Sequence, residues 1–157
     1  MKLVSGLLAI AVIAAASQAN AGTIAACGPQ KGHAYYPAAG LVKKGQDGWE
    51  DDQISGGSTT LTQNDKGELD VLFKDSRGEI VSSRDDGGQI IPLRMSSKEI
   101  TVLVAYPEGI QAAEIYSFVR EVDGKAKMLQ LSSKSAVMIP KAAVYVADCT
   151  TLNLPEK

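Results

Sequence analysis

The sequence predicts a mainly β protein: a single antiparallel meander of about eight strands that forms a small β-barrel or barrel-like sandwich with one disulfide. Two patterns predict this fold class. Segments rich in β-branched and aromatic residues alternate in polarity with a period of two, as half-buried strands do. Clusters of Gly, Asp, Asn and Ser, the residues that form tight turns, separate these segments at short intervals. No segment shows a comparable stripe with the helical period.

The first element is a predicted secretory signal peptide over residues 1–21. Lys2 supplies a positive charge before an apolar run over 3–16, and small residues stand at the −3 and −1 positions before Gly22. The apolar run is too short for a stable membrane-spanning helix. We therefore expect cleavage after Ala21 and a mature chain of 136 residues (157 less 21) with no transmembrane segment. The expected location is periplasmic or secreted.

Residues 22–57 form the next predicted unit, an irregular N-terminal strap laid across one end of the barrel. The stretch is rich in glycine, proline and alanine and has no sustained periodicity. Within it, residues 49–54 are predicted to form a single helical turn. Residues 58–157 make the antiparallel β domain. Strap and β domain together form one domain, as the length of the chain indicates.

Turn signals mark the ends of the strands in the β domain. The clusters at 64–67, 75–78 and 85–88 lie between the first four strands. Those at 96–98 and 107–109 lie in the next two connections. Asp123 and Gly124 give the strongest hairpin signal. The predicted strands are 58–63, 68–74, 79–84, 89–95, 99–106, 112–122, 125–133 and 142–149.

The connections between these strands are short, so consecutive strands are expected to pair antiparallel. An antiparallel meander of this length must also cover its apolar face. It can do so by closing into a barrel or by folding into two packed sheets.

The two cysteines, Cys27 and Cys149, predict one disulfide, because an exported protein meets an oxidising compartment. The bond would tie the start of the mature chain to its end. A lipid anchor on Cys27 is the alternative, since residues 24–27 have the residue types of a lipoprotein processing site. Polar Gln18 and Asn20 count against it, because they separate the apolar run from Cys27. Lipidation would also leave Cys149 as a free thiol.

Composition disfavours several classes of function. The formal net charge is −2, and Lys and Arg are spread along the chain without a run that could follow a phosphate backbone, so nucleic-acid binding is not expected. The only histidine, His33, lies six residues after Cys27, but a disulfide removes the thiolate that a Cys–His pair needs. With so few imidazole and thiolate ligands, neither a metal site nor another cofactor is expected.

Aromatic and acidic residues offer the candidate binding surface. Tyr35 and Tyr36 precede Trp49, which is followed directly by Glu50, Asp51 and Asp52; the pairing of an aromatic platform with carboxylates is common in sugar sites. Four further aromatic residues lie on predicted strands, where they either pack into the core or line a ligand cavity. They are Tyr106, Tyr116, Phe118 and Tyr145.

Several short motifs resemble those of a group of small exported bacterial proteins of unknown role. They are Cys27, Ala34-Tyr35-Tyr36, Gly48-Trp49, Ile54-Ser55-Gly56-Gly57, Val102-Leu103-Val104-Ala105-Tyr106, Glu114-Ile115-Tyr116-Ser117-Phe118 and Cys149. The resemblance covers most of the mature chain and implies no activity. In size, β content and single disulfide the chain also looks like the small periplasmic lysozyme inhibitors, although it lacks their inhibitory loop motif.

We therefore expect a non-catalytic exported envelope protein that acts by binding a protein or a small ligand of the cell envelope. The expected binding residues are Tyr35, Tyr36, Trp49, Glu50, Asp51 and Asp52. Two alternatives remain open. One is a small hydrolase that uses the carboxylates of Glu50, Asp51 or Asp52. The other is a lipid-anchored, inhibitor-like β-barrel. No oligomeric state is predicted.

Overall fold

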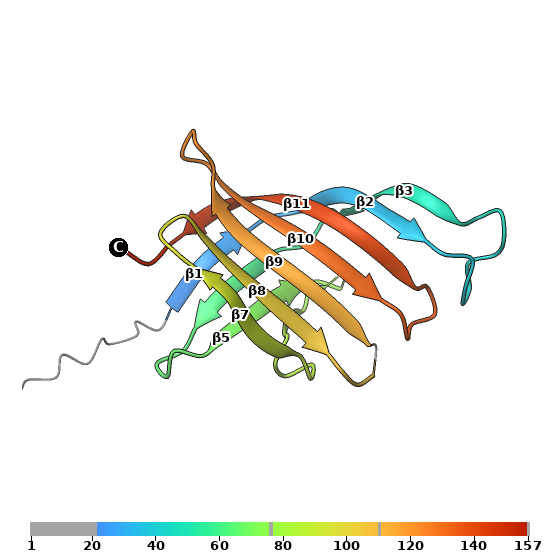
Figure 1. Cartoon of the computed structure of the whole chain (residues 1–157), viewed down its shortest axis with the longest axis horizontal. Coiled ribbons are helices and arrows are strands. Elements are labelled where there is room, and N and C mark those ends of the chain that lie inside the picture. The colour runs from blue at the N-terminus through green and yellow to red at the C-terminus, as the bar shows by residue number, and fades with distance from the viewer. Residues whose placement is uncertain (1–21, 76, 110, 157) are drawn as a thin grey trace, which may run out of the picture.

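The computed structural model describes residues 22–75, 77–109 and 111–156. Within these residues every regular element is a strand, and all eleven strands belong to one antiparallel sheet (Figure 1). The strands are β1 (Gly22–Cys27), β2 (Gln30–Tyr36), β3 (Gly48–Ile54), β4 (Thr59–Gln63), β5 (Leu69–Lys74), β6 (Ile80–Ser82), β7 (Gln89–Met95), β8 (Glu99–Tyr106), β9 (Ala112–Arg120), β10 (Ala126–Lys134) and β11 (Lys141–Leu152). The predicted signal peptide, 1–21, lies outside the described residues.

The main path of the sheet runs β6-β5-β4-β1-β11-β10-β9-β8-β7. It curls into a half-barrel, so that β5 and β7, close to its two ends, lie next to each other (Figure 1). The predicted fold class is confirmed. From β4 to β11, consecutive strands pair antiparallel as expected, with the exception of β6 and β7, which form the two ends of the path.

The predicted irregular strap, 22–57, is wrong, because this stretch contains three strands. β2 pairs with both β11 and β3, and β1 pairs with both β11 and β4. The chain from β1 to β2 and the chain from β3 to β4 thus form one long two-stranded ribbon, bent where Gly28 and Pro29 interrupt it. The helical turn expected at 49–54 is wrong as well, since these residues lie in β3.

The interior of the half-barrel has an apolar end and a polar end. At the apolar end, inward side chains from β1, β4, β5, β8, β9 and β10 pack into a core that excludes water. Its largest fully buried side chains include Phe118, Leu61, Ile100 and Met128. The other end carries buried polar side chains on β2, β4, β9 and β10, and the candidate site lies there.

The two ends of the sheet path are connected by the tight turn of residues 83–88. The amide of Ser83 donates to the Val71 carbonyl at 2.9 Å, and the amide of Gly88 donates to the Ser83 carbonyl at 2.7 Å. A Cβ on Gly88 would lie 2.6 Å from that Ser83 carbonyl oxygen and 3.0 Å from the Tyr106 ring, which explains the glycine. The turn brings the chain from β6 back to β7, which contacts β5 without a hydrogen-bonded ladder.

The predicted disulfide is confirmed. Cys27 in β1 and Cys149 in β11 are register partners and are bonded to each other, and no described cysteine is free. A lipid anchor on Cys27 would need this sulfur to be unpaired. No helix with the length and apolar character to cross a membrane occurs in the described ranges.

Candidate functional site

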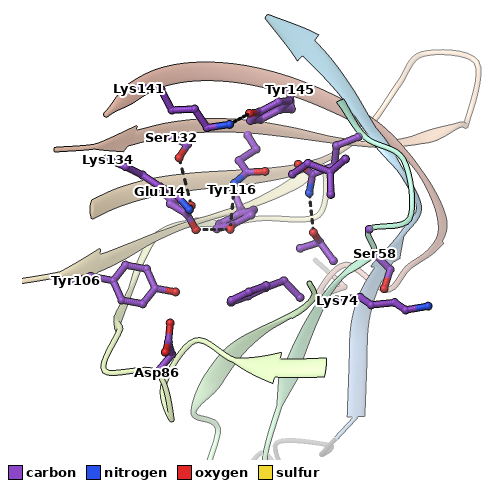
Figure 2. A pocket seen from close by; sticks show the side chains of 16 residues that line it. Ser58, Lys74, Asp86, Tyr106, Glu114, Tyr116, Ser132, Lys134, Lys141 and Tyr145 are labelled. Atoms are coloured by element: carbon purple, nitrogen blue, oxygen red, sulfur yellow. Dashed lines mark hydrogen bonds and ion pairs between the residues drawn. The ribbon is translucent and has the colours of Figure 1, made fainter. Parts of the chain in front are cut away.

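The polar end of the half-barrel contains a hollow of about 140 Å³ (Figure 2). Tyr106 on β8, Glu114 on β9 and Lys134 on β10 lie on one side of it, and Ser58 and Lys74 come from the opposite wall. The complete lining is Gln30, Ile54, Gly57, Ser58, Thr59, Phe73, Lys74, Asp86, Tyr106, Glu114, Tyr116, Gln130, Ser132, Lys134, Lys141 and Tyr145. We call this cavity the hollow.

Strand alternation directs polar side chains into the hollow. Glu114 and Tyr116 on β9 and Gln130 on β10 are buried. The neighbours of Gln130 on the opposite face, Leu129 and Leu131, are 40% and 49% exposed. The usual arrangement, apolar inside and polar outside, is thus reversed on β10. Burial of polar groups is costly unless they are hydrogen-bonded, so the contacts of each group matter.

Glu114 is the buried acid of the hollow, and three side chains satisfy it. Its Oε2 accepts a hydrogen bond from the Tyr116 hydroxyl at 2.6 Å. Its Oε1 accepts one from the Ser132 hydroxyl at 3.2 Å and pairs with Lys134 Nζ at 3.0 Å. The side chain of Glu114 is 6% exposed and that of Lys134 is 34% exposed. Lys134 therefore neutralises the buried carboxylate from the edge of the hollow.

Gln130 is held in one orientation by the same network. Tyr116 donates its only proton to the Glu114 carboxylate, which can only accept, so the Tyr116 oxygen must accept from Gln130. The bond from Gln130 Nε2 to this oxygen measures 3.1 Å. The amide cannot turn over without losing this bond. Gln130 Oε1 is buried and has no hydrogen-bond partner among the described residues.

Gln30 presents a second acceptor of the same kind. Its Nε2 donates to the Thr59 hydroxyl at 2.8 Å, and its Oε1 is buried without a partner in the described chain. Gln30 and Gln130 are 4% and 5% exposed. They come from β2 and β10 and both line the hollow, so two carbonyl oxygens there lack donors. Buried polar atoms in native proteins are nearly always bonded, so unpaired ones require an explanation.

A second charged group lies at the edge of the hollow around Asp52. Its Oδ2 accepts bonds from Lys141 Nζ at 2.6 Å, from the Tyr145 hydroxyl at 2.6 Å and from the Tyr36 hydroxyl at 3.1 Å. Asp52 and Tyr145 both pair in register with Gly32, which lies between them on β2. Because Gly32 has no side chain, Asp52 and Tyr145 can meet across it.

Burial and hydrogen bonding set the protonation of this group. Burial alone would raise the pKa of Asp52, but the bonds from Lys141, Tyr145 and Tyr36 outweigh it and hold the pKa below its usual value. Burial would lower the pKa of Lys141, and the bonds to Asp52 and Tyr145 raise it above its usual value instead. Asp52 and Lys141 are therefore both charged at neutral pH.

The phenols of the hollow keep their protons at neutral pH. Burial raises the pKa of Tyr106 to about 12, and burial together with the bond to Asp52 raises the pKa of Tyr145 to about 12. Burial, with the charge of Glu114, raises the pKa of Tyr116 well above 10. These side chains are neutral hydrogen-bond donors with large apolar rings.

The residues predicted as a binding surface divide between two faces of the β2–β3 ribbon. Tyr36 and Asp52 face the Lys141 group, as described above. Tyr35 and Trp49 lie on the opposite face, where their rings meet edge to face with centroids 5.6 Å apart. Trp49 is 68% exposed. Strand alternation separates residues that are adjacent in the sequence, and of the six predicted residues only Tyr36 and Asp52 lie at the edge of the hollow.

The two remaining acidic residues also differ in their surroundings. Asp51 is 95% exposed and pairs with His33 across the β2–β3 ladder at 3.0 Å. Glu50 is exposed and lies beside Leu41 and Ile139 in a shallow depression. Asp52 is the only one of the three with several hydrogen-bonding side chains around it.

Of the aromatic strand residues, Tyr106, Tyr116 and Tyr145 line the hollow and Phe118 lies in the apolar core. The acceptors Gln30 and Gln130 were missed by sequence reasoning. Their only signal is a polar residue at an inward position of a strand, and this signal needs the facing of the strand to be known.

No group of three or more metal-ligating side chains occurs in the described part of the chain. Comparisons with protein-family models, with curated proteins and with solved structures find no match to this chain.

Proposed function

We propose that this protein binds a small polar ligand in the hollow and acts by binding rather than by catalysis. One observation carries the proposal: Gln130 lines the hollow, and its buried side-chain oxygen, of fixed orientation, has no partner in the described chain. A ligand that donates a hydrogen bond there would satisfy an atom that the fold leaves unpaired. Gln30 supports the proposal, because it presents a second such atom from another strand.

The alternative hydrolase receives less support from the geometry. Two carboxyl groups at a shared cleft, one of them protonated as a general acid, are what glycoside hydrolysis requires. Asp52 is held ionised by three bonds, and Asp51 is exposed beside His33 on the opposite face of β3. Neither residue is arranged as a general acid. Glu114 is paired with Lys134 and bonded by Tyr116 and Ser132.

The test compares Gln130→Leu with the unchanged protein. Leucine keeps the size and removes the acceptor. The change removes an unpaired acceptor together with the bond from Nε2 to the Tyr116 hydroxyl, so it should reduce the free energy of unfolding by about 1 kcal/mol. Side-chain amide NMR signals of the protein are followed against a panel of neutral polyols, amino acids, polyamines and short carboxylates.

We expect one class of the panel to shift the Gln130 side-chain amide signal and Gln130→Leu to abolish its binding. Gln46→Leu, which removes an exposed amide from the connection between β2 and β3, is the matched control and should bind normally. Two results would overturn the proposal: no member of the panel shifts that signal at millimolar concentration, or Gln130→Leu binds as well as the unchanged protein.

A further inference from the structure

The ion pairs at the hollow limit the charge of a ligand that can bind there. Both charged pairs at the hollow are internally compensated, since Lys134 neutralises Glu114 at 3.0 Å and Lys141 neutralises Asp52 at 2.6 Å. A ligand with a net charge would have to give up its hydration without finding a free counter-ion among these four groups. Such a transfer is costly. The other charged lining residues, Lys74 and Asp86, are exposed, so the inner part of the hollow favours an uncharged ligand.

The unpaired groups specify hydrogen-bond donors on that ligand. The side-chain oxygens of Gln30 and Gln130 can only accept, and they approach the hollow from two different strands. A ligand that satisfies both must supply at least two donor hydrogens. Hydroxyl groups meet this requirement without adding charge. They can also accept, which suits the remaining protons of Lys134.

The apolar part of the lining specifies the body of the ligand. The rings of Tyr106, Tyr116, Tyr145 and Phe73 all line the hollow. Rings of this kind cover an apolar surface, and the hydroxyl groups of Tyr116 and Tyr145 are already bonded to Glu114 and Asp52. A compact molecule with apolar faces and polar edges matches this combination.

Size sets a limit on the ligand. A protein cavity of roughly 150 Å³ accommodates a benzene ring, and the hollow measures about 140 Å³. One six-membered ring therefore fills it. The hollow is open, because Ile54, Gly57, Lys74 and Lys141 line both the hollow and an adjoining surface groove. Substituents of a bound ring have room to extend outward along that groove.

We propose that the hollow binds an uncharged polyhydroxylated six-membered ring, a single sugar ring or a cyclitol, through the two glutamine oxygens of Gln30 and Gln130. This inference rests on the binding function proposed above and names its ligand class. The ring lies among the tyrosines, and two of its hydroxyl groups donate to the glutamines.

The experiment uses a matched series of probes that differ in one property each. D-Glucose and myo-inositol are neutral polyols, glucosamine adds a positive charge, glucuronate adds a negative charge, and cyclohexanol keeps the ring with a single hydroxyl. Dissociation constants are measured for the mature protein by NMR titration or calorimetry. We expect at least one neutral polyol to bind ten times more tightly than either charged probe and than cyclohexanol.

Variants identify the contacts. Gln130→Leu and Gln30→Leu should each weaken the binding of the neutral polyol at least fivefold, whereas Gln46→Leu should leave it unchanged. Retained dispersion in the amide spectrum shows that a variant is folded, and two glutamines on different strands provide independent tests.

The outcomes separate the two proposals. If glucosamine or glucuronate binds more tightly than the neutral probes and Gln130→Leu abolishes that binding, the proposed ligand class is wrong and the binding function stands. The same holds if only amino acids, polyamines or carboxylates bind at Gln130. If no probe and no panel member shifts the Gln130 amide signal, both proposals fail.

Discussion

Asp52 is bonded by three side chains from two other strands, Tyr36 on β2 and Lys141 and Tyr145 on β11. Its side chain is 19% exposed and that of Lys141 is 24% exposed. Pairs of this kind are worth more than those on the surface, since water screens them less. Both partners must stay ionised for the group to hold the β2–β3 ribbon against β11.

The lowered pKa of Asp52 predicts that the free energy of unfolding decreases at acid pH. The stabilisation by Asp52 is present above its ordinary pKa of 3.8 and is lost as the pH falls through its lowered value. Lys141 has a raised pKa, so its share is complete below 10.5 and is lost as the pH rises beyond that value. Asp52→Asn should reduce stability at neutral pH and flatten the loss below pH 3.8.

Urea unfolding measured across the pH range tests this prediction. Asp51→Asn is the control, because Asp51 is 95% exposed and pairs only with His33. If the two substitutions change the loss of stability at acid pH equally, the role assigned to Asp52 is contradicted.

Lys134 is predicted to be needed by the buried Glu114. Lys134→Met should destabilise the fold by about 3 kcal/mol, toward the low end of what an unpaired buried charge costs, because Lys134 is partly exposed. The double variant Lys134→Met/Glu114→Gln should regain most of this loss, since no uncompensated charge is left. Chemical unfolding of both variants measures the difference, and failure of the second change to restore stability would contradict the pairing.

The sequence predicts some residues of the site but not others. Tyr36 and Asp52 are part of the predicted surface, because an aromatic and acidic cluster is visible in the sequence. Gln130 is not, because Leu129 and Leu131 flank it and the alternation predicts them as the inward residues. In the half-barrel Gln130 points inward and the two leucines point outward. The local sequence does not show which face of the strand is enclosed.

The β2–β3 ribbon is the element that carries one wall of the site. Its contact with β11 depends on Gly32, where an added Cβ would collide with the Val144 carbonyl oxygen and approach the Tyr145 Cα at 2.8 Å. The glycine is required by close backbone approach and not by an unusual φ. Gly32 is therefore needed both for the close contact of β2 with β11 and for the bonds that Asp52 accepts from β11.

Gly32→Ala is predicted to detach the ribbon locally. We expect a loss of about 1–3 kcal/mol in stability, as for other overpacked sites, and faster hydrogen exchange in β2 and β3 than in β9 and β10. Gly56→Ala, where a Cβ meets nothing within 4 Å, is the control and should change little. Uniform protection in both halves of the sheet would contradict a local effect.

The strands from β4 to β11 follow from the sequence because their turns are short and the alternation is regular. β1, β2 and β3 do not. Glycine, proline and alanine dominate the composition around them, and their pairing is with distant strands, so no local pattern marks them. Propensity is a weak guide where tertiary pairing decides the structure.

On the scale of the whole molecule, the Cys27–Cys149 bond joins β1 to β11 over a sequence separation of 122 residues. In the chain-entropy model such a long loop contributes about 4–5 kcal/mol. The bond lies at the end of the barrel with the apolar core, where Cys27 belongs to the buried cluster.

Reduction of the disulfide is therefore predicted to lower the free energy of unfolding by about 2–5 kcal/mol, as for other small exported domains. Thermal unfolding of the Cys27→Ala/Cys149→Ala variant against the oxidised protein measures this. The hollow contains neither cysteine, so a variant that remains folded should still bind the ligand. A variant with unchanged stability would show that the bond adds nothing to the fold.

The position of β1 between β4 and β11 has a consequence for how the chain folds. The first described strand has no complete set of neighbours until the last strand arrives, because β11 supplies the partners of both β1 and β2. The hairpins from β7 to β11 can form from local contacts, but their joining to β1 must close nearly the whole chain. Such non-local pairings slow folding into the range of milliseconds to seconds. A Cys27–Cys149 bond formed early would hold β1 near β11 and reduce the loop-closure cost of this pairing.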